Sequence, residues 1–261
     1  MKNPNEPAGR ERDGPASRGL PSANGATQFA GSRGVDFMVL GGVLAAISEL
    51  YLATTSPYVV GEDNGEFSAI YAHGGVAHPS GYPLYTLLLR AFAWLPADTP
   101  ARGAGLVTAA IGLGAVALLY RACRAWSAGP AAAALASVAF GTAPVAWDLA
   151  TKAEVFALNA ALAAAIILVG APAGPVRGNA RAAWTGLLFG LGVSNHHTVV
   201  LLAPLGVWSL FASLRESSTR ARAALLCCAA FAAGLLPYAT LPLAARSSSG
   251  WVWGDVTSWH G

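Results

Sequence analysis

The sequence predicts an all-α integral membrane protein with about seven transmembrane helices and one further helix along the membrane surface. Hydrophobic residues make up 54% of the 261 residues and charged residues only 11%, whereas an ordinary soluble domain has about 25% charged residues. The apolar residues gather in long runs without a charge, such as AALAAAIILVGAPAG, as a membrane helix of roughly 20 residues requires. The net charge of +3 is too small to indicate nucleic-acid binding.

Residues 1–36 have a different composition from the rest of the chain. They are rich in Gly, Pro, Ser, Asn and Arg and poor in large apolar residues, a composition typical of disorder. The segment is too long and too polar to be a usual secretory signal. We therefore predict a disordered cytoplasmic tail over residues 1–36 and a transmembrane domain over residues 37–261, whose first span is not cleaved.

Seven apolar segments follow this tail and are predicted to cross the membrane. A further apolar segment, Thr86–Pro96, is too short to cross a core about 30 Å thick and contains Arg90. We place this segment along the membrane surface as an amphipathic helix. The seven spans are predicted at residues 37–60, 103–119, 130–147, 155–171, 182–193, 198–214 and 223–243.

The distribution of charge supports this arrangement. Cytoplasmic loops carry an excess of Lys and Arg. With the tail in the cytoplasm, the loops on the same side contain Arg121, Arg124, Arg177, Arg181, Arg215, Arg220 and Arg222. The loops on the outer side contain Glu62, Asp63, Glu66, Asp98, Asp148, Glu154 and Asp255.

Four polar segments fall on the outer side, and we expect them to converge into one site. They are GEDNGEFSAIYAHGGVAHPSGYPLY, WDLATKAEVFALN, SNHHT and RSSSGWVWGDVTSWHG. The chain has no Gly-rich phosphate loop and no nucleotide-binding βαβ pattern. A nucleotide-sugar donor bound in a soluble domain is therefore excluded as a function class, which favours a substrate reached from the bilayer.

Several motifs are also similar to those of a known family. EDNGEF, HPSGYPLY, KAEVFALNA, LGVSNHHTVVLLAP and GLLPYATLPLAAR resemble bacterial and animal membrane proteins related to protein O-mannosyltransferases, in the C-type superfamily of integral-membrane glycosyltransferases. The resemblance covers about Leu50 to Asp255. It implies a C-type glycosyltransferase fold, a donor sugar linked to a lipid phosphate, and an acceptor on the outer or lumenal side.

The chain departs from the pattern of this family in three places. Asn64 stands where the family would have Ser, and Ser80 stands where it would have a second Pro. Family members continue with more spans or an outer domain, whereas this chain stops at Gly261. We therefore expect a protein truncated at its C-terminus.

Asp63 and Glu66 are the candidate catalytic residues. An acid followed three residues later by Glu is also a capping box, in which both side chains only begin a helix at Gly65. The resemblance matches Asp63 to the Asp at the reaction centre, where a carboxylate would take the proton of a hydroxyl acceptor. Direct displacement with a single base would invert the anomeric centre. Glu66 would orient the acceptor or a cation, and Glu62 is a rival for either role.

His78 and Tyr82 are candidate substrate-binding residues in the same segment. His78 precedes Pro79, so its backbone is held extended. It belongs either to a structural turn or to a contact with the donor phosphate or the acceptor. Tyr82 is either an anchor at the membrane interface or a ring beside the sugar.

The remaining candidate binding residues lie in the other outer segments. Thr151 and Glu154 again have the spacing of a capping box. In the functional interpretation Lys152 pairs with the lipid phosphate and Glu154 orients it. The other candidates for contact with the departing phosphate are Asn195, His196, His197 and Arg246.

No metal ligand or cofactor is predicted, because no spacing is diagnostic of a metal site. A zinc site formed by histidines and nearby acids is the alternative, with the histidines His73, His78, His196 and His197.

The sequence thus predicts a glycosyltransferase that moves a mannose-like sugar from polyprenyl phosphate to a hydroxyl of a protein or glycan. The high Ala, Gly and Arg content is typical of a GC-rich bacterial genome, so we expect the inner membrane of a bacterium and a periplasmic site. Two alternatives stay open: a transporter or flippase of lipid-linked sugars, and an inactive truncated scaffold. A transporter needs polar groups at mid-membrane and at both mouths, whereas here they concentrate at the outer end.

Overall fold

The computed structural model describes residues 23–247 and 251–254. The chain divides into two units, residues 1–37 and residues 38–261, and each is described by itself. In the first unit, residues 23–37 form the start of helix α1, Ala23–Thr54, so residues 23–36 of the predicted tail are helical. Residues 1–22 lie outside the described residues.

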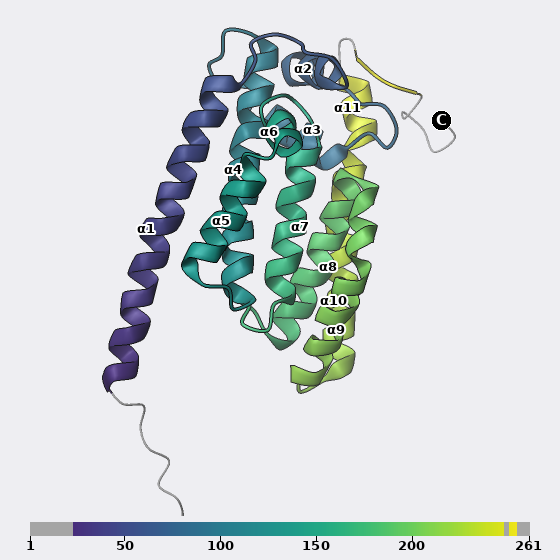
Figure 1. The fold of residues 1–261 in the computed structure, drawn as a ribbon. Helices are drawn as coiled ribbons and strands as arrows, with labels where there is room; N and C mark the ends of the chain where they lie inside the picture. The colour runs from purple at the N-terminus through teal and green to yellow at the C-terminus, as the bar shows by residue number, and fades with distance from the viewer. Residues whose placement is uncertain (1–22, 248–250, 255–261) are drawn as a thin grey trace, which may run out of the picture. The chain divides into compact units, whose positions relative to one another are not determined.

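The second unit is built from helices, and Figure 1 shows their arrangement. No β-strand occurs among the described residues, although Val76 and Val252 form an isolated parallel bridge. After α1 the helices are α2 (Asn64–His73), α3 (Pro83–Ala91), α4 (Pro100–Ala125), α5 (Pro130–Gly141), α6 (Pro144–Ala150), α7 (Phe156–Gly170), α8 (Gly178–Asn195), α9 (Ala203–Glu216), α10 (Arg220–Gly234) and α11 (Leu241–Ser247). The 3₁₀ helices η1 (His197–Leu202) and η2 (Leu236–Thr240) lead into α9 and α11.

The all-α membrane fold is confirmed, but the predicted count of seven spans is wrong. Within the described residues, four helical stretches are long and apolar enough to cross a membrane, and a fifth arises if α5 and α6 count as one broken span. Helix α7 is apolar but has only 15 residues. Helix α8 has 18 residues but is not apolar enough to count as a span. The four stretches are Gly34–Thr54, Pro100–Ala125, His197–Glu216 and Arg220–Arg246.

The third predicted span is broken because Pro144 begins a new helix. Helices α5 and α6 meet at an angle of 67°. A residue before proline is disfavoured in the α conformation, so helix α5 ends at Gly141 and the chain turns through Thr142 and Ala143. The turn directs α6 and the loop after it across the end of the bundle.

The segment predicted as a surface helix, residues 86–96, overlaps α3, which begins at Pro83 and ends at Ala91; its place along the membrane surface stays a prediction. Its side chains Tyr85 and Leu89 are fully buried in the main hydrophobic core together with Phe67 and Val107. Proline fits the first turn of a helix, where its missing N–H has no partner to lose. Helix α3 thus anchors the α2–α3 segment to the bundle through its apolar face.

Helices α8 and α10 pack closely through glycines. A Cβ atom on Gly186 would lie 2.0 Å from the Cys227 carbonyl oxygen, and one on Gly190 would lie 2.2 Å from that of Phe231. Small residues let backbones approach in this way in membrane helix pairs.

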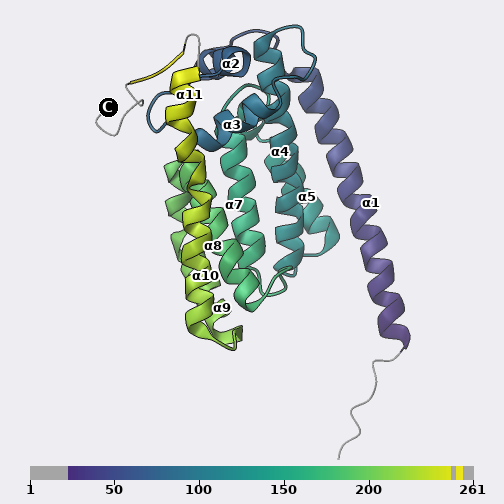
Figure 2. The same ribbon diagram turned by 180° about the vertical axis from the view of Figure 1, so that it is seen from behind.

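The two ends of the bundle differ in their polar side chains. The loops around α2, α3, α6 and α11 lie at one end, as the two opposite views agree (Figures 1 and 2). At the other end the Glu216 carboxylate accepts bonds from Arg177 and Arg181 at 3.4 and 3.2 Å. Arg181 is 2% exposed. The predicted separation of acidic outer loops from basic inner loops therefore corresponds to two opposite ends of the fold.

Candidate active site

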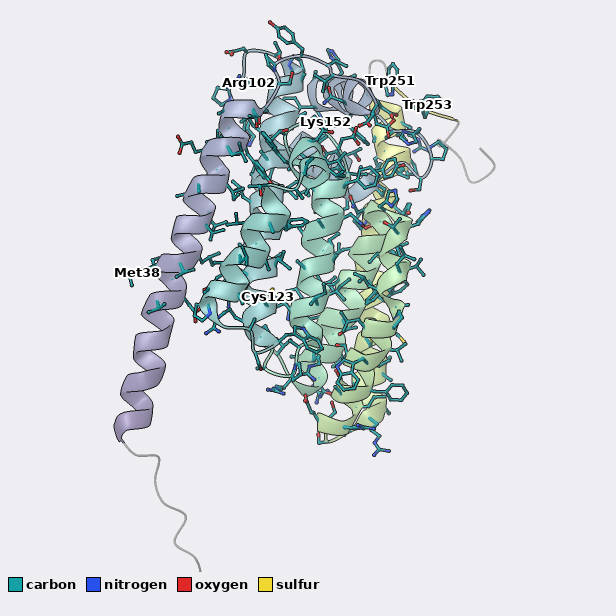
Figure 3. The ribbon with its side chains drawn as sticks, in the orientation of Figure 1. Met38, Arg102, Cys123, Lys152, Trp251 and Trp253 are labelled. Atoms are coloured by element: carbon teal, nitrogen blue, oxygen red, sulfur yellow. The ribbon has the colours of Figure 1, made fainter. Side chains whose placement is uncertain are left out.

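Five segments distant in sequence meet at the acidic end of the bundle. They are the loop before α2, the α2–α3 loop, the α6–α7 loop, the α8–η1 junction and residues 251–253. The predicted convergence of polar segments is therefore observed in the described residues. Lys152 and Trp251 lie at this end, whereas Cys123 lies nearer the other (Figure 3).

Asp63 occupies the N-cap position of α2, but the alternative interpretation of Asp63 and Glu66 as a capping box is wrong. Its side chain makes no capping hydrogen bond, and the Glu66 side chain bonds to His78 instead. The Asp63 side chain is 48% exposed, and its Oδ2 lies 3.8 Å from His78 Nε2. The helix start thus fixes the position of a carboxylate that stays accessible.

Glu66, His78 and Tyr82 form a hydrogen-bonded chain. The His78 backbone N–H donates to Glu66 Oε1 at 2.7 Å, and His78 Nδ1 lies 2.6 Å from Glu66 Oε2. The Tyr82 hydroxyl lies 2.9 Å from His78 Nε2. Because a carboxylate only accepts hydrogen bonds, His78 Nδ1 is the donor to Glu66 Oε2. This chain fixes the imidazole beside Asp63.

Trp251 adds a contact that the sequence did not predict. Its indole Nε1–H donates to Glu66 Oε1 at 3.2 Å. The Val76 N–H donates to the Trp251 carbonyl at 2.9 Å, and the Trp253 N–H donates to the Val76 carbonyl at 3.1 Å. The segment after α11 is thereby joined to the α2–α3 loop. In the sequence, the only sign of this contact is the pair of tryptophans in WVWGD.

Lys152 is buried between two acids. Its Nζ lies 2.6 Å from Glu62 Oε2 and 2.8 Å from Asp148 Oδ2, and the side chain is 7% exposed. Burial lowers the pKa of Lys152, but the hydrogen bonds that its ammonium donates to Asp148 and Glu62, with the charges of these acids, outweigh it, so the net shift is upward. The ammonium therefore stays charged and holds the loop before α2 against α6.

Glu154 does not form the capping box with Thr151 that was the alternative to a functional role, because α7 begins only at Phe156. Its side chain is 1% exposed, and Oε1 has no hydrogen-bond partner among the residues that the structure describes. Burial, followed by the charges of Asp63 and Glu62, raises the pKa of Glu154 to about 7. The nearby Lys152 and the backbone N–H of Asp63 act in the opposite direction.

These acids border an open cleft of about 730 Å³. Its acidic side is formed by Glu62, Asp63, Asp148 and Glu154. Its apolar side comes from Pro144, Val145, Leu149 and Phe156. A cleft with carboxylates on one wall and an aromatic ring on another suits a ligand with many hydroxyl groups and an apolar face.

His196 lies between two aromatic rings at the margin of this site. Its ring stacks on Tyr82 with centroids 6.0 Å apart and contacts Phe156 at 5.2 Å. The Thr198 backbone N–H donates to His196 Nδ1 at 3.3 Å, which places the ring proton on Nε2. Burial, with a smaller effect of His197, lowers the pKa of His196. His196 is therefore a neutral hydrogen-bond donor at neutral pH.

The other predicted binding residues take different positions. Asn195 is fully buried, and its Nδ2 donates to the Val155 carbonyl at 3.3 Å, which ties the end of α8 to the α6–α7 loop. His197 is exposed at the start of η1, and Arg246 is exposed in the last turn of α11. Their roles stay predictions.

Three of the site residues could hold a metal ion. Atoms of Asp63, Glu66 and His78 lie within 4.8 Å of one another. The histidine cluster considered from the sequence is not among the groups found in the described residues. A metal ion at Glu66 and His78 would have to displace the hydrogen bonds between them.

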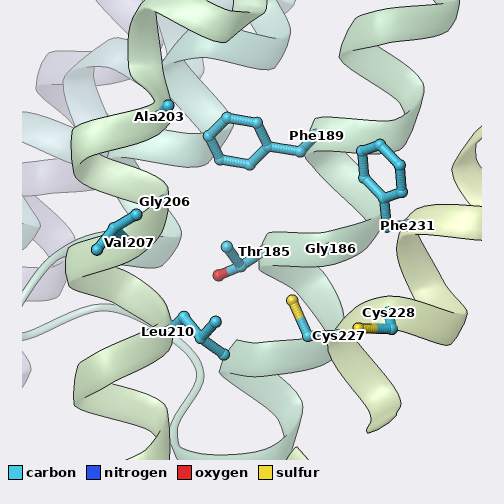
Figure 4. Close-up of a pocket in the computed structure, with 10 residues that line it drawn as sticks. All are labelled: Thr185, Gly186, Phe189, Ala203, Gly206, Val207, Leu210, Cys227, Cys228 and Phe231. Carbon is cyan, nitrogen blue, oxygen red and sulfur yellow. The ribbon is translucent and has the colours of Figure 1, made fainter. Parts of the chain in front are cut away.

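A separate apolar pocket of about 380 Å³ lies between α8, α9 and α10 (Figure 4). Its lining includes Phe189, Leu210 and Phe231, and it has no acid or histidine. It therefore belongs to the apolar part of the bundle and not to the polar site.

Comparison with known proteins identifies the family of this chain. Residues 63–220 match the model described as Protein O-mannosyl-transferase TMEM260 N-terminal domain. The chain is 33% identical to mouse Protein O-mannosyl-transferase TMEM260 over 226 residues, which are 84% of this chain and 32% of the relative. It is 30% identical to Dictyostelium discoideum Protein O-mannosyl-transferase tmem260 over 184 residues, which are 64% of this chain and 22% of that relative. No solved structure matches the chain.

The aligned part of the chain thus covers about a third of the length of the mouse protein. The matched region contains Asp63, Glu66, His78, Tyr82, Glu154 and His196. The chain belongs to the family of the Protein O-mannosyl-transferase TMEM260 N-terminal domain.

Proposed function

We propose that this chain forms the catalytic site of a membrane glycosyltransferase that moves a mannose-like sugar from polyprenyl phosphate to a hydroxyl group outside the cytoplasm. The names of the mouse and Dictyostelium relatives support sugar transfer to a protein. The observation that carries the proposal is the accessible Asp63 carboxylate at the edge of a cleft lined by acids and Phe156.

In the proposed reaction Asp63 is the base. The acceptor oxygen attacks the anomeric carbon as its proton passes to the Asp63 carboxylate. The bond between that carbon and the phosphate oxygen breaks, and the lipid phosphate leaves with the electron pair. Because the attack is direct, the anomeric configuration inverts.

The leaving phosphate gains charge and needs hydrogen-bond donors. His196 suits this role through its Nε2–H, and His197 and Arg246 lie at the same end of the bundle. Lys152 is paired with Glu62 and Asp148, so it would reach a phosphate only by leaving them. We therefore favour His196 over Lys152 as the first contact.

The site is proposed to face away from the cytoplasm, since the opposite end of the bundle has Arg177 and Arg181. The mouse and Dictyostelium relatives come from eukaryotes. A bacterial inner membrane as the location is our proposal from composition alone.

The test is sugar transfer by the full chain in liposomes supplied with labelled polyprenyl-phosphate mannose and an acceptor peptide. Asp63→Asn keeps the shape of the side chain and removes its basicity, so we expect transfer to fall by about 10²–10⁴-fold. Asp98→Asn, an exposed acid in the α3–α4 loop, is the matched control and should transfer normally. Near-normal transfer by Asp63→Asn would remove the assignment. Translocation of the lipid without transfer would favour the transporter.

A further inference from the structure

We propose that a pocket between α2, α3 and α11 binds the headgroup of an anionic phospholipid of the bilayer, with Arg90 and His73 as the donors to its phosphate oxygens. The pocket has a volume of about 290 Å³. It is separate from the acidic cleft, because His73 lies in the last turn of α2 and Asp63 at its start. Helix α2 has 10 residues, so its two ends lie about 15 Å apart. The proposal goes beyond sugar transfer and does not depend on it.

The first argument is the charge of the pocket. Arg90 and His73 line it, and none of the described residues in its lining is an acid. Lys152 at the acidic cleft is instead held between Glu62 and Asp148. The pocket at the end of α2 therefore attracts an anion and offers no described carboxylate to an ammonium group.

The second argument is the unused edge of the Arg90 guanidinium. Its Nη1 donates to the carbonyl oxygens of Tyr71 at 2.9 Å and Ala72 at 3.3 Å, which satisfies the end of α2 that would otherwise repel an anion. Both bonds use Nη1, so Nε and Nη2 have no partner among the described residues. Two parallel N–H groups on one edge of a guanidinium match two oxygens of a phosphate. Gly74 leaves this edge uncovered, because a Cβ atom there would lie 3.5 Å from Nε.

The other polar side chains of the pocket fit the same ligand. The His73 imidazole is exposed and has an N–H donor in either neutral tautomer. The hydroxyl groups of Thr86 and Thr240 already donate to main-chain carbonyls, at 3.3 and 2.6 Å. Their oxygens can still accept hydrogen bonds, which suits the hydroxyl groups of a glycerol headgroup. The donors that remain for the phosphate are thus Arg90 and His73.

The third argument is the apolar surface beside these groups. Leu87, Leu241 and Ala244 line the same pocket, and α3 and α11 lie next to each other at this end of the bundle (Figure 2). Leu243 in α11 is 63% exposed, and Trp94, just after α3, is 72% exposed. Exposed tryptophans are typical of the membrane–water interface, and basic pockets between membrane helices bind lipid headgroups. A ligand with both a phosphate and acyl chains therefore fits better than a phosphate ion from solution.

The experiment titrates the full chain in detergent with phosphatidylglycerol and, separately, with phosphatidylcholine, and native mass spectrometry counts the bound lipids. We expect one phosphatidylglycerol to bind more tightly than phosphatidylcholine. Arg90→Ala should weaken that binding on the order of 10-fold, since it removes hydrogen bonds to a charged group. Arg102→Ala is the matched control, because this arginine lies at the same end of the bundle (Figure 3) and does not line the pocket. It should bind like the wild type.

A second variant separates binding from the structural bonds of Arg90 to α2. Ala244→Phe fills the pocket from α11 and leaves the guanidinium and its carbonyl partners in place, so it should lose the bound phosphatidylglycerol as well. Thermal unfolding checks that each variant is folded. The inference is overturned if phosphatidylcholine binds as tightly as phosphatidylglycerol, if Ala244→Phe binds like the wild type, or if Arg102→Ala weakens binding as much as Arg90→Ala.

A competition arm distinguishes a bilayer lipid from the proposed sugar donor. Polyprenyl-phosphate mannose at the same concentration should leave the bound phosphatidylglycerol in place, whereas its displacement would assign the pocket to the donor and overturn the inference. These measurements need no acceptor, so their result stands apart from sugar transfer. Asp63→Asn should bind phosphatidylglycerol like the wild type even where it transfers no sugar, because Asp63 lies at the opposite end of α2.

Discussion

His78 is the residue on which most contacts of the site converge. Glu66 holds it through both the backbone N–H and Nδ1, while Tyr82 contacts Nε2 from the other side. The pairing of Glu66 with an imidazole also explains why Glu66 does not cap α2. We interpret Glu66 and Tyr82 as positioning residues that act on Asp63 through the ring of His78.

This interpretation predicts that the effects of Tyr82 and His78 substitutions are not additive. Tyr82→Phe removes one hydrogen bond and should lower transfer by roughly 5-fold, since such a bond contributes about 1 kcal/mol. In a His78→Asn background the same substitution should have almost no further effect, because its partner is already gone. The measurement is kcat/KM for the four members of this double-mutant cycle. Equal losses from Tyr82→Phe in both backgrounds would mean that the hydroxyl acts independently of His78.

At the scale of helices, the site depends on a break between α5 and α6 and on a hydrogen bond at the end of α8. Pro144 breaks the α5–α6 segment by 67°, which brings Asp148 and Lys152 over the end of the bundle. Asn195 then ties α8 to the α6–α7 loop beside Glu154. The polar groups of the site are thus positioned at the ends of helices, whereas the central parts of the helices pack closely through apolar residues.

The closest packing, between α8 and α10, predicts a sharp difference between two glycines. A methyl group at Gly186 would meet the Cys227 carbonyl at 2.0 Å, whereas nothing lies within 4 Å of the same position at Gly114 in α4. Gly186→Ala should therefore destabilise the fold by about 1–3 kcal/mol. Gly114→Ala should be neutral or slightly stabilising, because Ala favours a helix. Thermal unfolding in detergent compares the two, and an equal midpoint for both variants would show that α8 and α10 are less closely packed than described.

For the molecule as a whole, the sequence predicted the class of fold and the end at which the polar segments meet. Charge asymmetry and apolar runs are sufficient for that, because they follow directly from the bilayer. It did not predict the helix breaks or the partners within the site. The spacing of Asp63 and Glu66 is compatible with a capping box and with a Glu–His pair, and only the return of His78 through the α2–α3 turn decides between them. The sequence likewise placed residues 144–147, the first part of α6, at the end of a straight span, and so did not predict that α6 lines the same cleft as Glu154.

The orientation of the bundle in the membrane is the premise that the proposed chemistry requires. Asp98 is exposed in the α3–α4 loop, next to the acidic end. Ser218 is exposed in the α9–α10 loop, close to Glu216, which accepts hydrogen bonds from Arg177 and Arg181. In a chain with its own cysteines replaced, Asp98→Cys should react in intact cells with a maleimide that cannot cross the membrane. Ser218→Cys should react only after the membrane is permeabilised. The reverse pattern would place the cleft in the cytoplasm, where an acceptor outside the cytoplasm could not reach Asp63.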